Sequence, residues 1–400
     1  MVNITVVIGA NYGDEGKGHM VDYFADKAVE NGRHCLVVLS NGGPQRGHTV
    51  CTPDDTEHIF KHFGSGMLAG ADTLIPKTFI VNPMFFEQER KALFRKGRSS
   101  WANIYLTTSC MMTTPYEMIA NMLIEDARGD QRHGSCGCGI WETIVRGGVK
   151  VSEFLGMTHM QRVAYLKFVR DDYLYDRLSR KGVKVDEQWN RVLKSDVMIE
   201  NYIADFNSMI GRSILVDDYP CDTVYNYKEV IFENGQGLAI GEEYGDTKYG
   251  TPSHTGLKNP VQLIHDYYDN LEDTLRIDVC YVSRTYLTRH GMGPFPEEWD
   301  YLKDKQERDL LHETNQTNQY QGELRYARLN GFELHDRCVK DYENNIGDFA
   351  PISRWFVALT HVDEGASDSL YVALPVKYES WGHRRDAIHE YKDKRLIRFL

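Results

Sequence analysis

Ile4-Thr5-Val6-Val7-Ile8 leads into the glycine loop Gly13-Asp14-Glu15-Gly16-Lys17-Gly18. A buried strand that breaks into glycines and then a lysine is typical of a phosphate-binding loop, because glycines let backbone N–H groups approach the anion and lysine adds positive charge. Only two residues separate Gly13 from Gly16, fewer than in the usual nucleotide-binding loop. The acids Asp14 and Glu15 therefore indicate that this tight loop also binds a metal or moves a proton.

The residues after this loop predict a β-α-β opening. Lys17–Glu30 has Met20, Phe24 and Ala28 on one helical face, and Cys35–Leu39 is a short apolar run typical of a buried strand. This order favours an α/β fold with a central, mostly parallel β-sheet flanked by helices, and ligands at the carboxyl ends of its strands. Further buried strands are expected at 78–81, 230–233, 277–282, 353–359 and 370–374.

Two longer segments have a different character. Residues 149–212 are largely helical in pattern, with one polar side, and the charged, amide-rich residues 302–321 are expected to form an insertion or a mobile loop. The chain contains no internal repeat or low-complexity linker, and nothing in it forces a domain boundary. The prediction is therefore a single domain over residues 1–400.

Composition narrows the class of protein. A hydrophobic content of 42% fits a globular fold, and a net charge of −12 without a long basic run argues against nucleic acid as a main partner. The N-terminus enters a strand directly, so neither a signal peptide nor a membrane span is expected. The eight cysteines are scattered, which favours free thiols in a reducing, cytoplasmic setting. A metal or redox role for the close pair Cys136 and Cys138 is the weakest alternative, because the usual four-ligand set is absent.

A second glycine motif, Gly47-His48-Thr49, lies shortly after the second strand. In a parallel sheet it would lie beside the first loop. A histidine there can act as a general acid or stabilise transferred phosphoryl charge. A surface histidine in a turn is the competing interpretation.

Two later motifs also follow predicted strands. Gly235-Gln236-Gly237 offers an amide that can hydrogen-bond the edge of a base, and Thr360-His361-Val362-Asp363 offers a carboxylate that can accept from N1–H and the 2-amino group of guanine. An exposed amide in a turn and an aspartate cap are the alternatives.

Together and in this order, these motifs resemble the adenylosuccinate synthetase family. The most specific match is the run Ser283-Arg284-Thr285-Tyr286-Leu287-Thr288-Arg289-His290-Gly291-Met292-Gly293-Pro294-Phe295-Pro296. The resemblance covers most of the chain. It implies a fold related to P-loop proteins with extra small subdomains in one domain, and a homodimer.

The resemblance also implies a ligase of purine biosynthesis. Such an enzyme activates the 6-oxygen of IMP with the γ-phosphate of GTP, using Mg²⁺, and the amine of L-aspartate displaces that phosphate from 6-phosphoryl-IMP to give adenylosuccinate. By its place in the motif, Asp14 would deprotonate N1 and ligate Mg²⁺ together with Gly47. His48 would act as the acid on the phosphoryl group, and Gln236 would contact the purine 6-position.

Binding residues follow from the same motif positions. The resemblance assigns the triphosphate to Gly13, Glu15, Gly16, Lys17, Gly18, Thr49 and Asp363. It assigns the monophosphate substrate to Gln45, Ser135, Arg146, Gln236 and Thr251, with Arg146 matching an arginine that reaches across a dimer interface. It assigns the amino acid to Arg325 and Arg328.

The chain departs from the family pattern in three places. Pro44-Gln45-Arg46 replaces two asparagines and an alanine, and His361 stands where the family has lysine. In residues 322–331, Tyr326 replaces an expected arginine, Arg328 falls on another, and Arg325 can substitute from one position away. A bidentate arginine is not readily replaced by tyrosine, so this loop leaves the sugar and the amino donor open.

Two alternative functions remain. One is a viral-type 2-aminoadenylosuccinate synthetase acting on dGMP, with ATP as a possible phosphate donor. Those relatives usually have a small residue where Asp14 stands, so Asp14 favours IMP. The other is a purine-nucleotide-binding protein without catalysis, against which the retained Asp14 and His48 argue. The sequence does not decide between ribose and deoxyribose, GTP and ATP, cellular and viral origin, or oligomeric states.

Overall fold

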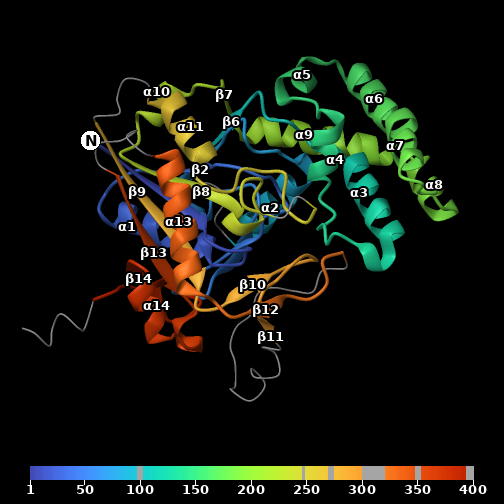
Figure 1. Cartoon of the computed structure of the whole chain (residues 1–400). Helices are drawn as coiled ribbons and strands as arrows, with labels where there is room; N and C mark the ends of the chain where they lie inside the picture. Colours follow the sequence, from blue (N-terminus) through green and yellow to red (C-terminus); the bar gives the residue numbers. More distant parts are fainter. Residues whose placement is uncertain (97–101, 246–247, 269–273, 300–319, 347–352, 393–400) are drawn as a thin grey trace, which may run out of the picture.

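The computed structural model describes residues 1–96, 102–245, 248–268, 274–299, 320–346 and 353–392 (Figure 1). A sheet of ten strands crosses this described part of the chain. All neighbouring strands in it are parallel except the edge pair β14 and β15. Their spatial order is β15 (Ile388–Glu390), β14 (Val376–Ser380), β13 (Ser353–Thr360), β9 (Leu275–Arg284), β1 (Val2–Gly9), β8 (Glu229–Gly237), β2 (Cys35–Leu39), β5 (Asp72–Ile75), β6 (Ile104–Thr107) and β7 (Ile214–Val216).

Helices cover both faces of this sheet (Figure 1). The central strands are apolar on both sides, as expected for a buried parallel sheet. Alternate residues of each strand therefore enter two different cores. The helices of the described chain are α1 (Lys17–Glu30), α2 (Pro83–Arg95), α3 (Pro115–Arg128), α4 (Ile140–Arg146), α5 (Val151–Gly156), α6 (His159–Phe168), α7 (Tyr175–Arg180), α8 (Glu187–Leu193), α9 (Val197–Arg212), α10 (Cys221–Val224), α11 (Lys258–Tyr267), α13 (Gly331–Asn345) and α14 (Asp368–Ala373).

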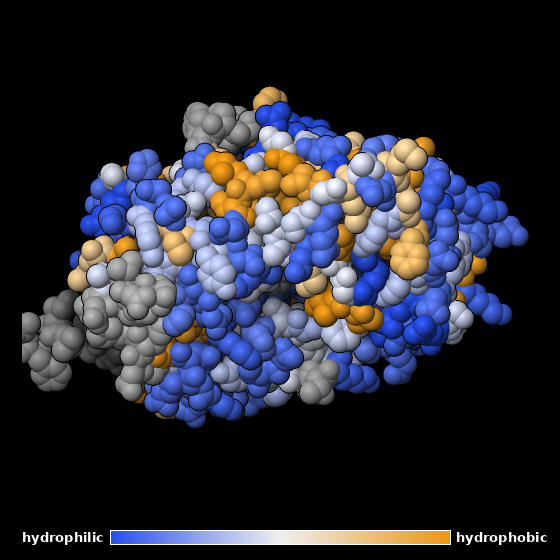
Figure 2. Space-filling view, turned by 90° about the horizontal axis from the view of Figure 1, so that it is seen from above, coloured by the Kyte–Doolittle hydropathy of each residue, from blue (hydrophilic) through white to orange (hydrophobic). Residues whose placement is uncertain are grey.

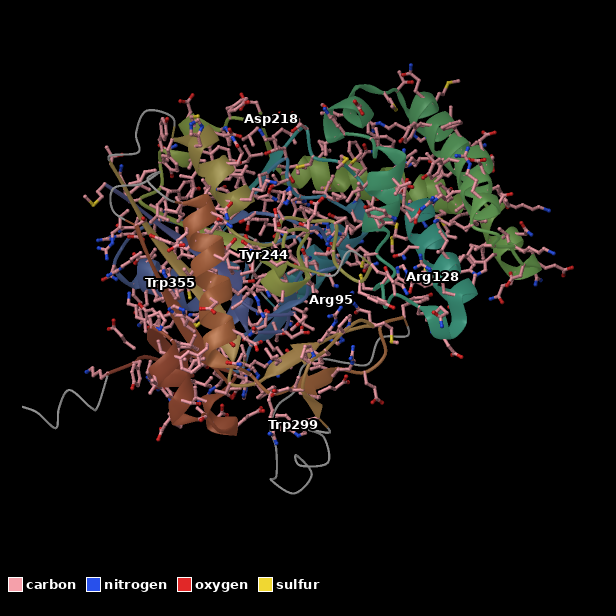
Figure 3. The ribbon with its side chains drawn as sticks, viewed as in Figure 1. Arg95, Arg128, Asp218, Tyr244, Trp299 and Trp355 are labelled. Atoms are coloured by element: carbon pink, nitrogen blue, oxygen red, sulfur yellow. The ribbon has the colours of Figure 1, made fainter. Side chains whose placement is uncertain are left out.

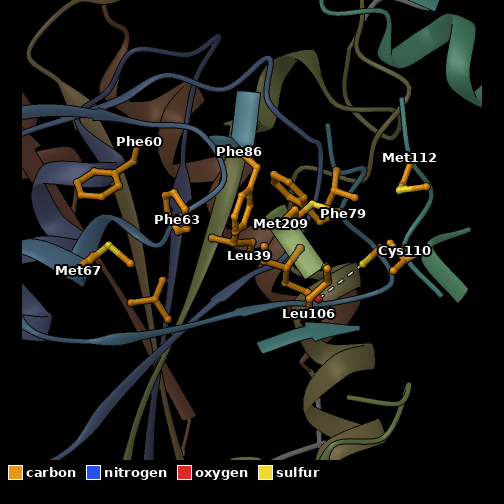
Figure 4. Close-up of a cluster of buried hydrophobic side chains, with 14 of the residues drawn as sticks. Leu39, Phe60, Phe63, Met67, Phe79, Phe86, Leu106, Cys110, Met112 and Met209 are labelled. Atoms are coloured by element: carbon orange, nitrogen blue, oxygen red, sulfur yellow. Dashed lines mark hydrogen bonds between the residues drawn. The ribbon is translucent and has the colours of Figure 1, made fainter. Parts of the chain in front are cut away.

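One core joins the sheet to α1, α2, α3 and α9. Figure 4 shows part of it, where Phe63, Phe79 and Phe86 gather around Leu39 at the end of β2. The opposite core joins the sheet to α11, α13 and α14. The two cores hold β1, β2 and β8 from both faces, which fixes the positions of the loops that leave their carboxyl ends.

Two small sheets stand outside the main one. β3 (His48–Cys51) and β4 (Glu57–Phe60) form an antiparallel hairpin. β10 (Leu287–Arg289), β12 (Arg325–Ala327) and β11 (Glu298–Trp299) form a three-stranded antiparallel sheet. Figure 3 shows Trp299 in this small sheet, well away from Trp355 of the main sheet. These additions agree with the small subdomains that the resemblance implies.

Most predicted elements are confirmed. Lys17–Glu30 is a helix and Cys35–Leu39 a strand with the predicted bounds. Strands 230–233, 277–282 and 353–359 lie inside β8, β9 and β13, and residues 149–212 are mostly helical. Residues 302–319 of the charged segment lie outside the described residues. The single domain over the whole chain stays a prediction.

Two predicted strands are wrong. Residues 78–81 make only isolated bridges, Phe79 to Gly42 and Val81 to Met112, and the strand of this region is β5. Residues 370–374 belong mostly to α14, whose N-cap Ser367 accepts from a backbone N–H of the first turn. A short apolar run does not distinguish a buried strand from a buried helix.

All eight cysteines are free, as the sequence predicted. In the described part of the chain, no helix combines the length and apolar character needed to cross a membrane. The cytoplasmic location stays a prediction.

Candidate functional site

The carboxyl ends of β1, β8, β9 and β13 border a cavity of about 340 Å³. This is the edge at which open parallel sheets bind their ligands. Residues of all four predicted motifs line it: Gly13, Asp14, Gly16, Lys17, Gly18, Gln45, Gly47, His48, Thr49, Gln236 and Asp363. The prediction that the 47–49 loop lies beside the 13–18 loop is confirmed.

The loop after β1 has a backbone that requires its glycines. Gly13 has φ 121° and Gly16 has φ 93°, both in the left-handed region that favours glycine. Asp14 is also left-handed, with φ 62°, a conformation that costs energy for a residue with a side chain. Such strained positions cluster at functional sites, and Asp14 lines the cavity.

Glu15 shapes the loop from inside. Its carboxylate accepts backbone N–H bonds from Asn11 (3.1 Å) and Gly13 (2.8 Å), and its other oxygen lies 2.7 Å from Nζ of Lys17. Burial raises the pKa of Glu15, but Lys17 and these hydrogen bonds outweigh it and hold the pKa below its usual value. The Glu15 side chain therefore faces the protein rather than the cavity, and Lys17 provides the loop's cation at the cavity wall.

The long run 283–296 holds this loop in place. Nε of Arg284 donates to the carbonyl of Asp14 (2.6 Å), and the hydroxyl of Thr288 donates to the carbonyl of Gly13 (2.8 Å). The hydroxyl of Thr360 at the end of β13 donates to the carbonyl of Glu15 (2.8 Å). The three consecutive carbonyls of residues 13–15 thus accept hydrogen bonds from side chains of β9, β10 and β13.

The carboxylate of Asp14 has one neighbour that the sequence did not predict. Oδ2 of Asp14 lies 3.3 Å from Nε2 of His290, and both residues line the cavity. About a fifth of the Asp14 side chain is exposed (20%), so the carboxylate remains open to a ligand. A carboxylate in this setting can accept a proton or ligate a cation.

His48 is held by a buried carboxylate. Its Nδ1 lies 2.6 Å from Oε1 of Glu233, and its Nε2 lies 3.3 Å from the carbonyl of Gly235. Glu233 also accepts from the backbone N–H of Ser65 (3.1 Å) and pairs with Arg46 (3.3 Å). These contacts fix the plane of the imidazole at the cavity wall.

The surroundings lower the pKa of both Glu233 and His48. Burial raises the pKa of Glu233, but Arg46, His48 and Ser65 together lower it to about 2. Burial lowers the pKa of His48; Glu233 opposes this, while Arg46 and Lys17 add to the lowering. The glutamate therefore stays ionised at neutral pH, and burial disfavours the protonated form of the imidazole.

Two amides in the cavity have unsatisfied polar atoms. Nδ2 of Asn41 donates to Oε1 of Gln236 (3.3 Å), which orients the Gln236 amide, while the buried Nε2 of Gln236 has no hydrogen-bond partner among the described residues. Oε1 of Gln45 is likewise buried without a partner there. Buried polar atoms are normally hydrogen-bonded, so these amides fit a polar ligand.

The sequence matches one known family over most of its length. Residues 6–325 match the family model of adenylosuccinate synthetase. The chain belongs to the adenylosuccinate synthetase family. A relative from Blochmanniella pennsylvanica is 28% identical over 304 residues, covering 74% of this chain and 65% of that protein. One from Dehalococcoides mccartyi is 28% identical over 325 residues, covering 78% and 70%. The chain thus matches slightly less than two thirds of the first relative.

Solved structures of family members have the same fold. The fully ligated adenylosuccinate synthetase of Plasmodium falciparum gives a TM-score of 0.69 at 15% identity, with 98% of this chain and 100% of that chain covered. The succinoaminodeoxyadenylate synthetase of cyanophage S-2L, bound to dGMP and dATP, gives 0.65 at 16% identity, with 100% and 98% covered. Both likenesses confirm the expected α/β architecture.

Three residues that the family resemblance assigned to the monophosphate do not line the cavity. The hydroxyl of Ser135 donates to Asn121 (2.8 Å), and the backbone N–H of Thr251 bonds within its own loop. Arg146 forms a buried ion pair with Glu117 of the same chain. That pairing gives no support to a role for Arg146 across an interface.

The predicted amino-acid residues also lie apart from the cavity lining. Arg325 forms an ion pair with Glu298 (2.6 Å) inside the small three-stranded sheet. Arg328 follows the end of β12 and is exposed. Tyr326 is buried and packs on Tyr286, with ring centroids 6.0 Å apart. The arginine-to-tyrosine change thus fills the core of the small sheet.

Sequence reasoning missed several site residues. Glu233, His290 and Asn41 were not assigned roles, and Arg46 was regarded only as a departure from the family. An available signal was the acidic Glu233 directly after the apolar residues 230–232, because a charge within a buried strand is rarely left unpaired. His290 carried no comparable signal.

Proposed function

We propose that this chain is a ligase that forms adenylosuccinate from IMP and L-aspartate with hydrolysis of GTP, in purine biosynthesis. The observation that carries the proposal is the convergence of Asp14, Lys17, His48, Gln236 and Asp363 on one cavity. These residues supply a base, a phosphate cation, a phosphoryl-stabilising imidazole, a purine-binding amide and a guanine-binding carboxylate. Membership of the adenylosuccinate synthetase family supports the same reaction.

In the first step, Asp14 accepts the proton from N1 of the hypoxanthine. The electron pair moves to the 6-oxygen, which forms a bond to the γ-phosphorus of GTP as the bond from that phosphorus to the β–γ bridging oxygen breaks. GDP leaves and 6-phosphoryl-IMP remains. His48 and Lys17 offset the charge on the transferring group, and such positioned charge is the main requirement of phosphoryl transfer.

In the second step, the amine of L-aspartate bonds to C6. The bond between C6 and the phosphorylated oxygen breaks, inorganic phosphate leaves, and the amine nitrogen gives up a proton. Oriented Gln236 holds the 6-substituent through both steps, since its free Nε2 can donate to an oxygen there.

The oxygen donors at the loop suit Mg²⁺. The Asp14 carboxylate and the Gly47 carbonyl would hold the ion, because Mg²⁺ prefers oxygen ligands and takes few from the protein when phosphates and waters complete the octahedron. Bound there, it would neutralise charge on the phosphates. His290, 3.3 Å from Asp14, is close enough to compete for the same carboxylate when protonated.

The remaining binding roles are proposed on the resemblance. The backbone of Gly13–Gly18 and Thr49 binds the triphosphate, with Glu15 acting through the shape of the loop. Gln45, Ser135 and Thr251 contact the monophosphate, and Arg325 or Arg328 contacts the amino acid. Ser135, Thr251 and both arginines lie outside the cavity lining. Their proposed contacts therefore require a rearrangement of these segments when the ligands bind.

A homodimer is proposed as the assembly. The face viewed from above carries a wide apolar area (Figure 2). Figure 1 places β7, α5, α9 and α10 at this side of the molecule. Large exposed apolar side chains on or beside these elements are Leu155, Val197, Ile214, Leu215 and Tyr219. Exposed apolar patches of this kind mark interaction surfaces.

Substrate profiling tests the proposed reaction. Phosphate release should require IMP, L-aspartate, GTP and Mg²⁺ together, with Asp14→Ala as the inactive control. IMP, dIMP, GMP and dGMP are each compared with GTP and with ATP. Preference for dGMP would replace the proposal with the 2-aminoadenylosuccinate reaction, and nucleotide binding without phosphate release would replace it with a non-catalytic role.

A further inference from the structure

Three side chains of types that can ligate a metal lie close together beside the cavity wall. Sγ of Cys51, a carboxylate oxygen of Asp55 and a ring nitrogen of His383 all lie within 4.8 Å of one another. Cys51 ends β3, Asp55 lies in the turn of the β3–β4 hairpin, and His383 lies between β14 and β15. None of the three has a role in the proposed reaction.

The fold brings these segments together independently of the side chains. Cys51 forms an isolated backbone bridge with Arg384, next in sequence to His383. Arg385 is anchored to α1 by a two-pronged ion pair with the buried Asp22, with Nε 2.5 Å and Nη2 2.9 Å from its oxygens. Cys51 is buried, with 4% exposed. The thiol and the backbone beneath His383 are therefore fixed, whereas the Asp55 and His383 side chains are exposed and can rotate.

The donor set selects a class of cation. Sulfur, imidazole nitrogen and carboxylate oxygen together suit Zn²⁺ and similar borderline-soft cations, whereas Mg²⁺ and Ca²⁺ prefer oxygen alone. Given Zn–N near 2.0 Å and Zn–S near 2.3 Å, donors in a tetrahedral zinc site lie roughly 3.3–3.8 Å apart. The observed donor atoms lie within 4.8 Å of one another. A movement of about 1 Å by the exposed Asp55 and His383 side chains would bring them to the separation of a tetrahedral site.

We propose that Cys51, Asp55 and His383 bind a divalent cation of the zinc type, with water as a fourth ligand. On binding, the thiol proton is released to solvent and a sulfur–metal bond forms. The thiolate and the carboxylate then balance the charge of the dication. Arg384, whose Nη1 lies 3.6 Å from Asp55 and whose Nε lies 3.4 Å from Asp386, retains the second partner when the metal takes the first.

The cation would connect two walls of the cavity. β3 begins with His48 and Thr49, and the opposite segment contributes Gly382 and His383 to the cavity lining. A metal between Cys51 and His383 would therefore clamp the histidine-bearing hairpin to the segment beside Asp363. This inference does not depend on the proposed reaction, because the binding is measured without substrates.

Titration of tag-free, metal-stripped protein with Co²⁺ tests the site. Cobalt bound to a thiolate gives a sulfur-to-metal charge-transfer band, and tetrahedral cobalt gives intense visible bands. One equivalent should produce both in the wild type, and Zn²⁺ should abolish them by displacement. Cys51→Ser should remove the charge-transfer band and weaken binding by at least roughly tenfold, since even partners of metal ligands are worth that much.

Two further variants keep the result decisive if the buried Cys51→Ser fails to fold. Asp55→Asn changes an exposed ligand and should weaken Co²⁺ binding while the charge-transfer band remains. Cys221→Ser removes a partly exposed thiol elsewhere and should leave the titration unchanged. No charge-transfer band in the wild type, or a band that disappears in Cys221→Ser and survives in Cys51→Ser, would overturn the proposal.

Discussion

Nδ1 of His48 lies 2.6 Å from Oε1 of Glu233, and both side chains are buried at the cavity wall. The same carboxylate pairs with Arg46 at 3.3 Å. A glutamate in this position selects the imidazole tautomer with hydrogen on Nδ1 and stabilises the ring when it becomes charged, as carboxylates do for other catalytic histidines. Glu233 is therefore a positioning residue for His48.

Glu233→Gln should slow catalysis mainly through kcat. The amide keeps the shape of the side chain but removes the charge that supports a protonated His48, so kcat is expected to fall about 10²-fold or more while KM for the nucleotides changes little. The pH profile of kcat should shift to lower pH, because the imidazole loses a group that raises its pKa. An unchanged profile would leave Glu233 with a structural role only.

The same substitution should also reduce stability. Arg46 is fully buried as a side chain, and loss of its charged partner leaves an unbalanced cation, at a cost of about 3 kcal/mol. Chemical denaturation measures this loss. Arg46→Met combined with Glu233→Gln provides the comparison, since removing both charges should recover much of the stability without recovering kcat.

Asp14→Asn should separate catalysis from folding. Its carboxylate is partly exposed to the cavity, and within the described part of the chain its ion-pair partner is His290, so the free energy of unfolding should change by less than about 0.5 kcal/mol. The turnover rate should fall roughly 10²- to 10⁴-fold through loss of the base. Steady-state phosphate release and denaturation of the same preparation provide both numbers. Full activity in Asp14→Asn would exclude this residue as the base.

Glu15→Gln, at the next position, should instead reduce the stability of the fold. Glu15 is 1% exposed and its carboxylate pairs with the buried Lys17. Neutralising it leaves Lys17 without its partner, and we expect unfolding to become easier by about 3 kcal/mol. A variant with wild-type stability would show that the ion pair does not hold the loop.

The fold could be predicted where local pattern decides it. Lys17–Glu30 and Cys35–Leu39 combine helical or continuous apolar periodicity with glycine or polar boundaries, and both were predicted with the observed bounds. The strand predicted at residues 370–374 was wrong because the apolar run is short and the N-cap Ser367 favours a helix there. Local pattern therefore succeeds where its boundaries agree with the apolar run and fails where a helix cap sets the conformation.

The sequence motifs predicted which residues belong to the site, but they did not predict which side chains pair with one another. Glycine loops after strands located Asp14, His48, Gln236 and Asp363. The partner of His48 lies 185 residues away in sequence, and nothing local links the two. The direction of the Glu15 side chain was equally hidden, because it depends on which of two adjacent acids is turned inward by the left-handed loop.

Thr288→Val should loosen the phosphate loop. The Thr288 hydroxyl is the donor to the Gly13 carbonyl at 2.8 Å, and valine keeps the shape without the donor. Loss of one such bond costs about 1 kcal/mol, so KM for the triphosphate should rise roughly fivefold with a smaller change in kcat. Thr285→Val, whose hydroxyl donates to the carbonyl of His361 at 3.2 Å instead, is the matched control. Equal effects from both variants would contradict a specific role for Thr288.

Asp341 should make the folded state less stable as pH rises from about 4 to 6. This buried carboxyl on α13 accepts from the hydroxyls of Tyr281 (2.8 Å) and Tyr244 (3.3 Å). Burial raises its pKa from 3.8 to about 6, against the lowering effect of these bonds. Between those values the folded chain holds a proton that the unfolded chain has lost, so the free energy of unfolding falls with pH, by about 3 kcal/mol in all.

Asp341→Asn removes this titration. Its stability relative to wild type should therefore increase as pH rises from 4 to 6 and become constant above the folded pKa. Asp22, whose pKa burial also raises to about 6, contributes the same sign in both proteins and cancels in the difference. Urea denaturation of the two proteins at several pH values measures that difference. A difference that is flat across this range would mean that Asp341 is ionised in the fold, with its two tyrosine hydroxyls compensating for burial.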